Sequence, residues 1–270
     1  MALVAVLWIV AALSVLVTGV VQAQRAELRL AGAARSSLLG DAAGQAAIYL
    51  VLQRLGSGAP RVDRLTRTVV RYGEQDLTVE VMPLTGLVDL NLAPAPLLAA
   101  FFARVGGADD GRASAIADAL VARRSANGGA SGLLSAPEEL LSVPGVDYEL
   151  FARIAGSVTT DSRGGGRINP LAAPIEVLSF LAPGNAALAR RIADERDAGA
   201  VAIDTTRLEG TFIDATVSSR TRFTAHVPMP DGARVLVVRD IDTSAAAGAA
   251  APWQTLRAST RWIAQARVGP

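Results

Sequence analysis

The side chains that most enzymes use for acid–base or nucleophilic chemistry are scarce in this sequence. It contains no cysteine and one histidine, His226, in 270 residues. Without thiols it forms neither disulfides nor a thiolate zinc site, and a single imidazole cannot build a histidine-rich metal centre. His226 lies in a segment that alternates like a β-strand and has no nucleophile beside it in the sequence, so we expect a structural histidine. No catalytic residue is predicted.

Carboxylates in the C-terminal third could supply oxygen ligands to a calcium ion. The candidates are Asp204, Glu209, Asp214, Asp240 and Asp242. Their spacing matches no calcium-binding loop, so solvated turn carboxylates are the favoured interpretation, and Asp240 and Asp242 remain the metal candidates. The run Gly164–Gly166 lacks the Lys-Ser/Thr of a phosphate-binding loop, which favours a flexible linker.

The chain has no overall electrostatic field that would attract polyanions, because its charges nearly balance. All 26 basic residues are arginines, they are balanced by 25 acidic residues, and the formal net charge is +1. The net charge therefore does not favour a function based on bulk electrostatic attraction.

The first 24 residues contain no charged side chain. A helix of that length, rising about 1.5 Å per residue, crosses a hydrocarbon core of about 30 Å, so we predict a retained transmembrane helix. A cleaved secretory signal is the alternative, because Val21 to Ala23 resembles a cleavage site, but the apolar run is too long and has no basic start. The flanking arginines Arg25, Arg29 and Arg35 favour a cytoplasmic body by the positive-inside rule, and a removed basic leader would reverse that orientation.

Helical periodicity continues beyond the apolar segment. Apolar and small residues recur at steps of three, four and seven, with polar residues between them. They are Leu28, Ala31, Leu38, Ala42, Tyr49 and Leu52. We predict a single helix to about Leu55, ended by the Gly56–Pro60 sequence, and its amphipathic half needs a surface to pack against.

Alternating segments on both sides of the middle region predict that surface. The expected strands are Thr66–Tyr72, Asp76–Val81, Thr221–Val227, Arg234–Arg239 and about Leu256–Ile263. The first four form two hairpins, because turn-forming residues separate the members of each pair. The alanine-rich segment 245–252 is expected to be a loop.

The region 86–204 contains an internal repeat at a shift of 78 positions. Asn91, Pro96, Phe102 and Gly106 recur as Asn169, Pro174, Phe180 and Gly184. Residues 136–142 resemble residues 173–179 as a third copy of the central element. Because proline is tolerated in the first turn of a helix and glutamate complements its N-terminus, each copy predicts a short helix.

The segment from Leu140 to Ile154 resembles a helix-hairpin-helix motif. Its hairpin consists of Val143, Pro144, Gly145 and Val146. In nucleic-acid-binding versions, the hairpin amides contact phosphates with the help of basic residues. Here Asp147 and Glu149 follow the hairpin, and region 86–204 holds ten arginines against fourteen acidic residues. A hairpin used for packing is therefore favoured over a DNA contact.

In their order, these parts resemble the minor pseudopilin K family of bacterial type II secretion systems over essentially the whole chain. The resemblance is carried by the Trp8-containing apolar helix, the Asn-centred helix starts at Asp89–Pro94 and Gly166–Pro170, and the Val-Pro-Gly-Val hairpin. It implies a pilin-like fold with a large helical insertion. It also implies a non-enzymatic subunit that lies with minor pseudopilins I and J at the tip of a periplasmic pseudopilus.

The resemblance further implies a mature N-terminus at Met1 after removal of a leader. Most pilins carry glutamate at the fifth mature position, whereas this chain has Ala5, an absence that is expected for subunit K. Calcium is common among pseudopilins. The implied partners are the I and J subunits, the major pseudopilin, the inner-membrane secretion platform and lipid, with no nucleic acid. The candidate contact residues are Leu38, Ala42, Tyr49 and Leu52.

We therefore expect an α+β protein in which a long N-terminal helix packs on a small antiparallel sheet, with an inserted all-α domain of helix-hairpin-helix or SAM-like repeats. The expected divisions are the transmembrane segment 1–24, the amphipathic helix and first hairpin 25–85, the insertion 86–204 and the final strands 205–270. The expected function is to initiate or cap a pseudopilus that exports folded proteins, from a single-pass inner-membrane position with a periplasmic body. The alternative is a membrane-anchored DNA-binding protein similar to competence receptors.

Overall fold

The computed structural model describes residues 34–57, 62–126, 132–230, 232–244 and 252–263, together with Trp8, Gln24, Glu27 and Gly32. The expected transmembrane segment 1–24 lies outside the described residues except for two helical positions, and so do Met1, Ala5 and loop residues 245–251. Within the described part of the chain, no helix is both long enough and apolar enough to cross a bilayer.

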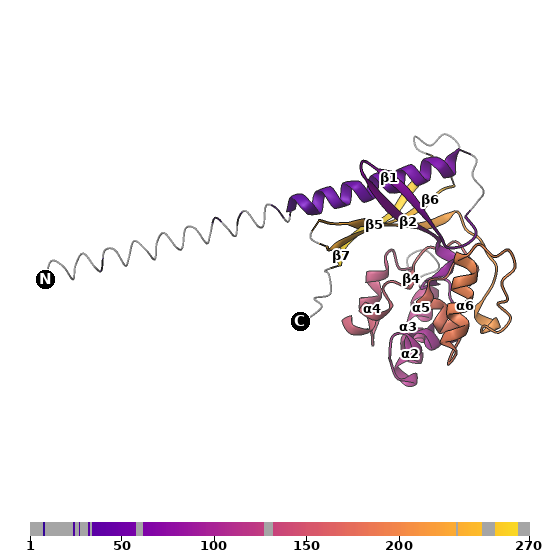
Figure 1. Ribbon diagram of the computed structural model, residues 1–270. Coiled ribbons are helices and arrows are strands. Elements are labelled where there is room, and N and C mark those ends of the chain that lie inside the picture. Colours follow the sequence, from indigo (N-terminus) through magenta and orange to yellow (C-terminus); the bar gives the residue numbers. More distant parts are fainter. Residues whose placement is uncertain are drawn as a thin grey trace.

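A helix and a five-stranded antiparallel sheet form one part of the molecule, which we call the sheet domain (Figure 1). The helix covers residues 34–56. The sheet has the order β1-β2-β5-β6-β7, with every neighbouring pair antiparallel. Its strands are β1 (Thr66–Tyr72), β2 (Gln75–Pro83), β5 (Arg220–Pro228), β6 (Arg234–Asp242) and β7 (Gln254–Ile263). Both predicted hairpins, the last strand and the helix end near Leu55 are confirmed.

Strand alternation places one set of apolar side chains under the helix. This shared core includes Val79 and Val81 from β2, Phe223 and Ala225 from β5, Val235 and Val237 from β6, and Ala47, Ile48, Val51 and Leu52 from the helix. The helix backbone comes unusually close to the sheet at Gly44, where a Cβ atom would lie 2.4 Å from a Val237 methyl carbon. Only glycine permits this approach, so Gly44 fixes the height of the helix above the sheet.

The chain between β2 and β5, which we call the helical insertion, lies on the opposite side of the sheet from helix 34–56 (Figure 1). Its helices are α2 (Ala95–Arg104), α3 (Asp110–Ala126), α4 (Tyr148–Ile154), α5 (Ile175–Leu181) and α6 (Ala186–Asp197). The described residues of the insertion also form the 3₁₀ turns η1 (Leu84–Gly86), η3 (Pro137–Ser142) and η4 (Gly210–Phe212) and a parallel strand pair, β3 (Val88–Asp89) with β4 (Val158–Thr159). Apart from η1, these elements share a core separate from that of the sheet, whereas Leu84 of η1 packs in a small cluster with Leu65, Met82 and Leu87.

Three details of the insertion correct or refine the sequence interpretation. The insertion continues past Asp204, because Leu208 and Phe212 are buried in its core. The segment read as a third repeat copy forms a short helix of the 3₁₀ type, η3. The Gly164–Gly166 run is a packed turn rather than a free linker: Gly166 has φ +78°, and a Cβ there would lie 2.3 Å from the Leu92 carbonyl oxygen.

The two asparagines of the proposed repeat both tie loops together. The buried Asn91 amide donates to the carbonyls of Leu134 and Thr160 and accepts from the Leu134 amide. The buried Asn169 amide donates to the carbonyls of Asp63 and Thr216. Satisfied buried amides of this kind fix loop positions. The repeat itself stays a prediction.

Candidate assembly surface

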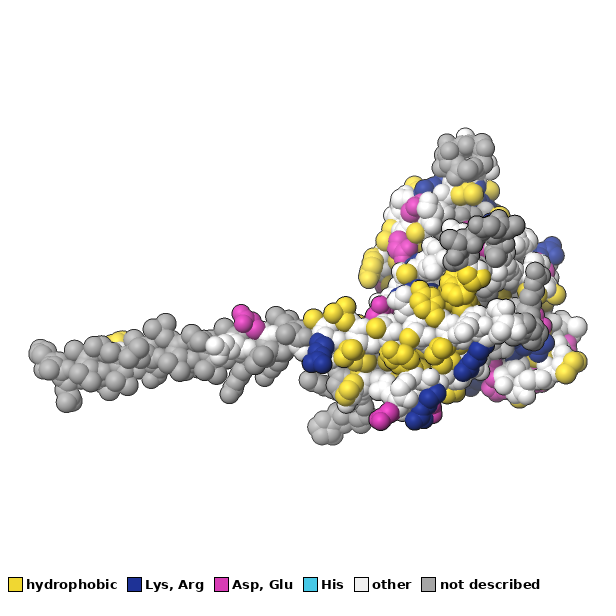
Figure 2. All heavy atoms as spheres, turned by 90° about the horizontal axis from the view of Figure 1, so that it is seen from above, with side chains coloured by type: hydrophobic (Ala, Val, Ile, Leu, Met, Phe, Trp, Pro, Cys, Tyr) yellow, Lys and Arg dark blue, Asp and Glu magenta, His cyan; other side chains and the backbone are white. Residues whose placement is uncertain are grey.

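One face of helix 34–56 points away from the sheet and carries exposed apolar side chains. Leu38 is 72% exposed and Tyr49 42% exposed, and Ala42 between them is also exposed. We call these three residues the exposed stripe. Figure 2 shows a row of apolar side chains along the outer face of this helix. Because soluble monomers seldom expose contiguous apolar surface without a use for it, the stripe is the candidate contact surface.

Leu52 does not belong to this surface. Its side chain is 2% exposed and packs in the core of the sheet domain. The three-residue step from Tyr49 turns the side chain about 300° around the helix, toward the sheet, and the sequence pattern alone did not separate the two faces. Leu52 is therefore removed from the candidate contact residues.

Contacts with β7 hold the stripe in place. The Trp262 indole N–H donates to the Ser37 hydroxyl at 3.3 Å, and the Thr260 hydroxyl donates to the Asp41 carboxylate. Farther along the helix, the Tyr49 ring lies 6.1 Å from the Trp253 ring. The helix therefore approaches β7 at residues 37–41, and Tyr49 lies near the residue that precedes β7.

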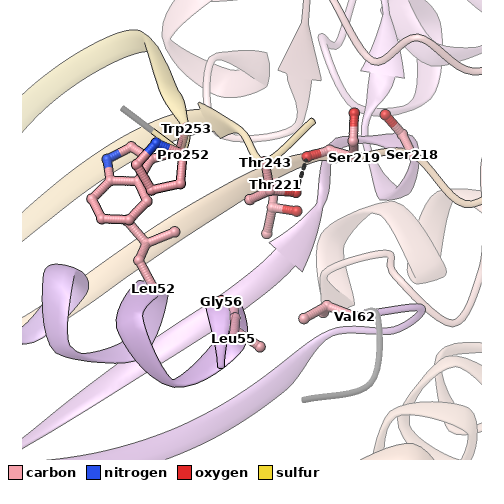
Figure 3. Close-up of a pocket in the computed structure, with 10 residues that line it drawn as sticks. All are labelled: Leu52, Leu55, Gly56, Val62, Ser218, Ser219, Thr221, Thr243, Pro252 and Trp253. Carbon is pink, nitrogen blue, oxygen red and sulfur yellow. Dashed lines mark hydrogen bonds between the residues drawn. The ribbon is translucent and has the colours of Figure 1, made fainter. Parts of the chain in front are cut away.

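A cavity of about 210 Å³ lies at the C-terminal end of the helix (Figure 3). Its walls include the apolar side chains Leu52, Leu55, Val62 and Trp253 and the hydroxyl side chains Ser218, Ser219, Thr221 and Thr243. The Thr243 hydroxyl donates to the Ser219 carbonyl at 2.8 Å (dashed in Figure 3). None of the described residues that line the cavity carries an acid, a base or a thiol, so they provide no group for acid–base catalysis.

The two calcium candidates instead form ion pairs with arginines of β5. Asp240 accepts two hydrogen bonds from Arg222, at 2.7 and 2.9 Å, and Asp242 accepts one from Arg220 at 3.1 Å. All four side chains are nearly fully buried. Arginine neutralises both carboxylates, so they lack the net negative charge that a calcium site requires.

These pairs also link the sheet to the helical insertion. Arg222 donates to the Gly156 carbonyl at 3.4 Å, and Arg220 forms an ion pair with Asp161. Burial opposes ionisation of Asp242, but hydrogen bonds from Ser244, Ser219 and Arg220 outweigh that effect and lower the pKa of its carboxyl to about 2. The arrangement is a structural joint.

The other three calcium candidates lie apart and have separate partners. Glu209 pairs with Arg104 at 2.6 Å, and Asp214 accepts from the Thr216 amide at 3.0 Å. Asp204 accepts from the hydroxyl and the amide of Thr206, which lowers its pKa. Among the described residues, no three His, Cys, Asp or Glu side chains form a group that could hold a metal ion.

His226 lies in β5, as the alternation predicted. It is half-buried, and burial together with the nearby Arg234 and Arg67 charges lowers its pKa, although Glu80 acts in the opposite direction. Its neighbours across the strands are Thr78 and Leu236.

The hairpin of the helix-hairpin-helix segment packs within the insertion. Gly145 has φ +90°, and a Cβ there would lie 3.1 Å from the Ile116 side chain. Arg112 donates to the Gly145 carbonyl at 2.9 Å and to Asp147. Asp147 caps α4 through the Leu150 amide, and that bond, followed by the Arg112 contact, lowers the pKa of its carboxyl.

This electrostatic arrangement does not favour phosphate binding. The nearby basic groups are already engaged, because Arg112 pairs with Asp147 and Arg153 pairs with Glu149. A phosphate would have to approach these two carboxylates.

The architecture matches that of a known secretion subunit. A similar solved structure is GspK in the crystal structure of the GspK–GspI–GspJ complex from the type 2 secretion system of enterotoxigenic Escherichia coli. The match has a TM-score of 0.51 at 13% sequence identity and covers 88% of this chain and 100% of the other. This chain has a pseudopilin-like fold. Neither a protein-family model nor a curated protein sequence matches it.

The sequence predicted part of this fold and missed two of its ion pairs. The α+β class and the antiparallel sheet expected from the sequence are confirmed. The Arg220–Asp242 and Arg222–Asp240 pairs were missed, although the sequence holds a signal for them. Arginines two residues apart begin one strand of the second hairpin, and aspartates two residues apart end the other, so correct pairing of the hairpin brings them together.

Proposed function

We propose that this chain is a minor pseudopilin of a type II secretion system, a non-enzymatic subunit at the tip of the pseudopilus. The observation that carries the proposal is the fold match to GspK, which spans 88% of this chain and the whole of that one. GspK forms a complex with GspI and GspJ. By analogy, the partners proposed here are minor pseudopilins of the I and J kinds, with the major pseudopilin below them.

The proposed location is the inner membrane, with the body in the periplasm. The uncharged segment 1–24 would be the single membrane anchor, next to the secretion platform and lipid. Reporter fusions after Leu55 test this topology. A periplasmic reporter signal is expected, and a cytoplasmic one would contradict it.

Two features support the terminal position. The uncharged segment 1–24, which includes Ala5, provides no carboxylate for the amino group of a neighbouring subunit, an interaction that is most favourable where water is excluded. The helical insertion adds the bulk of a small domain on one side of the sheet, which would obstruct further subunits there (Figure 1). The proposed role is therefore to initiate or cap the pseudopilus during export of folded proteins.

The exposed stripe is the proposed contact with the other minor pseudopilins, because its burial would drive association. The test is a pull-down of those subunits by the full chain carrying Leu38→Arg or Tyr49→Arg. Both substitutions should greatly reduce recovery, because each buries an unpaired guanidinium in an apolar contact.

Val201→Arg is the matched control. Val201 is 94% exposed but lies in the helical insertion, away from the stripe. This variant should recover partners as the unaltered chain does. Full recovery by both stripe variants would refute the stripe as the contact surface.

A further inference from the structure

Strand β7 leaves one side of the sheet open. It is ten residues long, and within the described part of the chain only β6 pairs with it. Trp262 and Ile263 at its end are 41% and 44% exposed. An edge strand of this length presents unpaired N–H and C=O groups along one side, which form a template for another strand.

The opposite edge, β1, is shorter and its charges are already matched. It has seven residues. Arg67 pairs with Glu80 and Asp197, and Arg71 pairs with Asp76. The Asp197 contact also joins this edge to α6 of the insertion. Of the two edges, β7 is therefore the more available.

The β7 edge carries unmatched positive charge. Its ten residues include Arg257 and Arg261 and no acidic residue. Arg257 pairs with Glu138, but Arg261 forms no ion pair with any described residue. Arg261 lies opposite Leu236. Arg234, also without an ion pair among the described residues, lies two residues from Leu236 along β6 and therefore on the same face. Two guanidinium groups that pair with no described carboxylate therefore lie near this edge.

The edge is continuous with the exposed stripe. The contacts of Ser37 with Trp262 and of Asp41 with Thr260 place the helix directly beside β7. A partner that covers Leu38 and Ala42 would therefore lie next to the open side of the strand.

We propose that β7 takes up an additional strand, supplied by an extended acidic segment of a partner minor pseudopilin. The partner's backbone would pair with the open side of β7, and its carboxylates would lie opposite Arg261 and near Arg234. The strand addition follows from the edge and its charge, whereas the identity of the partner rests on the proposed function.

The backbone amide of Ala258 allows this strand pairing to be tested directly. The Met229 amide donates to the Ala233 carbonyl, so the alternation of backbone bonds along the antiparallel strands turns the Val238 backbone toward β7. Ser259 lies opposite Val238, and its backbone therefore faces β6. Successive residues of a strand direct their backbone groups to opposite sides, which turns the Ala258 amide toward the open side. Ala258→Pro removes that donor at an exposed edge position, where proline is tolerated. Ala258→Val keeps the donor and is the matched control.

The test uses the detergent-solubilised full chain and a fluorescent ten-residue peptide of alternating valine and glutamate. Control peptides are a block sequence of the same composition and an alternating valine–arginine peptide. Fluorescence anisotropy should show the alternating acidic peptide binding about tenfold or more tightly than either control peptide. Ala258→Pro and Arg261→Glu should each weaken binding by about threefold or more.

Ala258→Val and Arg207→Glu, the latter an exposed arginine of the insertion, should bind the acidic peptide as the unaltered chain does. Hydrogen exchange should show slower exchange of the Ala258 amide when the peptide is bound. Equal binding of the alternating and block peptides, or full binding by Ala258→Pro, would overturn strand addition. These outcomes are independent of pseudopilus assembly, whereas failure of partner recovery in the pull-down bears on the proposed function.

Discussion

The sheet domain and the helical insertion differ in how much of their apolar surface and backbone hydrogen bonding is completed within the chain. In the insertion, Phe101 packs against Phe102 and Phe180, Phe180 stacks on Phe212, and Asp147 and Asn185 cap helices. Its most exposed apolar side chains, Val201 and Tyr148, lie on separate segments. Isolated exposed apolar residues of this kind are ordinary on protein surfaces.

The sheet domain, by contrast, leaves a stripe on its helix and an open edge beside it. The difference indicates a division of roles within the chain. The insertion forms a complete small domain that adds bulk, and the sheet domain has the surfaces that association would complete.

The largest expected effect comes from the aromatic core of the insertion. Phe101 is fully buried, with its ring 5.4 Å from that of Phe180. Phe101→Ala should lower the free energy of unfolding of the insertion by about 3–5 kcal/mol, through lost burial and a residual cavity. Urea titration followed by hydrogen exchange measures this. Exchange in β5 and β6 should change far less, and equal loss of protection in both parts would show that they do not have independent cores.

The joint between the two parts gives the next largest effect. Arg222→Met leaves the Asp240 carboxylate buried without its partner, which should cost about 3 kcal/mol or more. The double variant Arg222→Met/Asp240→Leu removes both charges and should recover most of that loss. Urea denaturation of the single and double variants checks this. A double variant as unstable as the single one would show that the pair does more than neutralise itself.

Low pH should weaken the joint between the two parts at its second ion pair, Arg220–Asp242. The pKa of Asp242 is lowered to about 2, from about 3.9 in an unfolded chain, so its contribution is present above pH 4 and is lost as the pH falls toward 2. The loss should be about 1–2 kcal/mol. Asp242→Asn should flatten the fall in melting temperature between about pH 4 and pH 2. An unchanged acid profile in this variant would assign the acid sensitivity to other carboxylates.

The smallest effect is expected in DNA binding. The hairpin arginines Arg112 and Arg153 pair with carboxylates, so the body from about residue 25 onward should bind duplex DNA with a dissociation constant of about 10 µM or weaker at moderate salt. Fluorescence anisotropy with labelled duplex measures this. Submicromolar binding abolished by replacing Gly145 would instead support the DNA-receptor alternative.

The sequence predicted elements more reliably than surfaces. Strands such as Thr221–Val227 and the helix end near Leu55 followed from local alternation and turn residues, which act over a few positions. The burial of Leu52 and the close approach at Gly44 could not be predicted in this way, because both depend on how the helix is placed above strands more than 150 residues away.

The partners of the ion pairs could not be predicted from local sequence patterns either. Asp240 and Asp242 looked like free carboxylates until pairing of β5 with β6 placed Arg222 and Arg220 opposite them. The arginine pairs at the edges were equally hidden, because ion pairs such as Arg67–Asp197 join residues that only the finished fold brings together.

The central claim, a minor subunit at the tip of a pseudopilus, is tested most directly by counting this chain in purified filaments. Pseudopili are sheared from secreting cells, and quantitative mass spectrometry gives the ratio of this chain to the major subunit. The account predicts about one copy per filament, because the bulk of the insertion and the lack of a carboxylate in segment 1–24 oppose further stacking. A ratio close to that of the major subunit, or complete absence from the filaments, would contradict it.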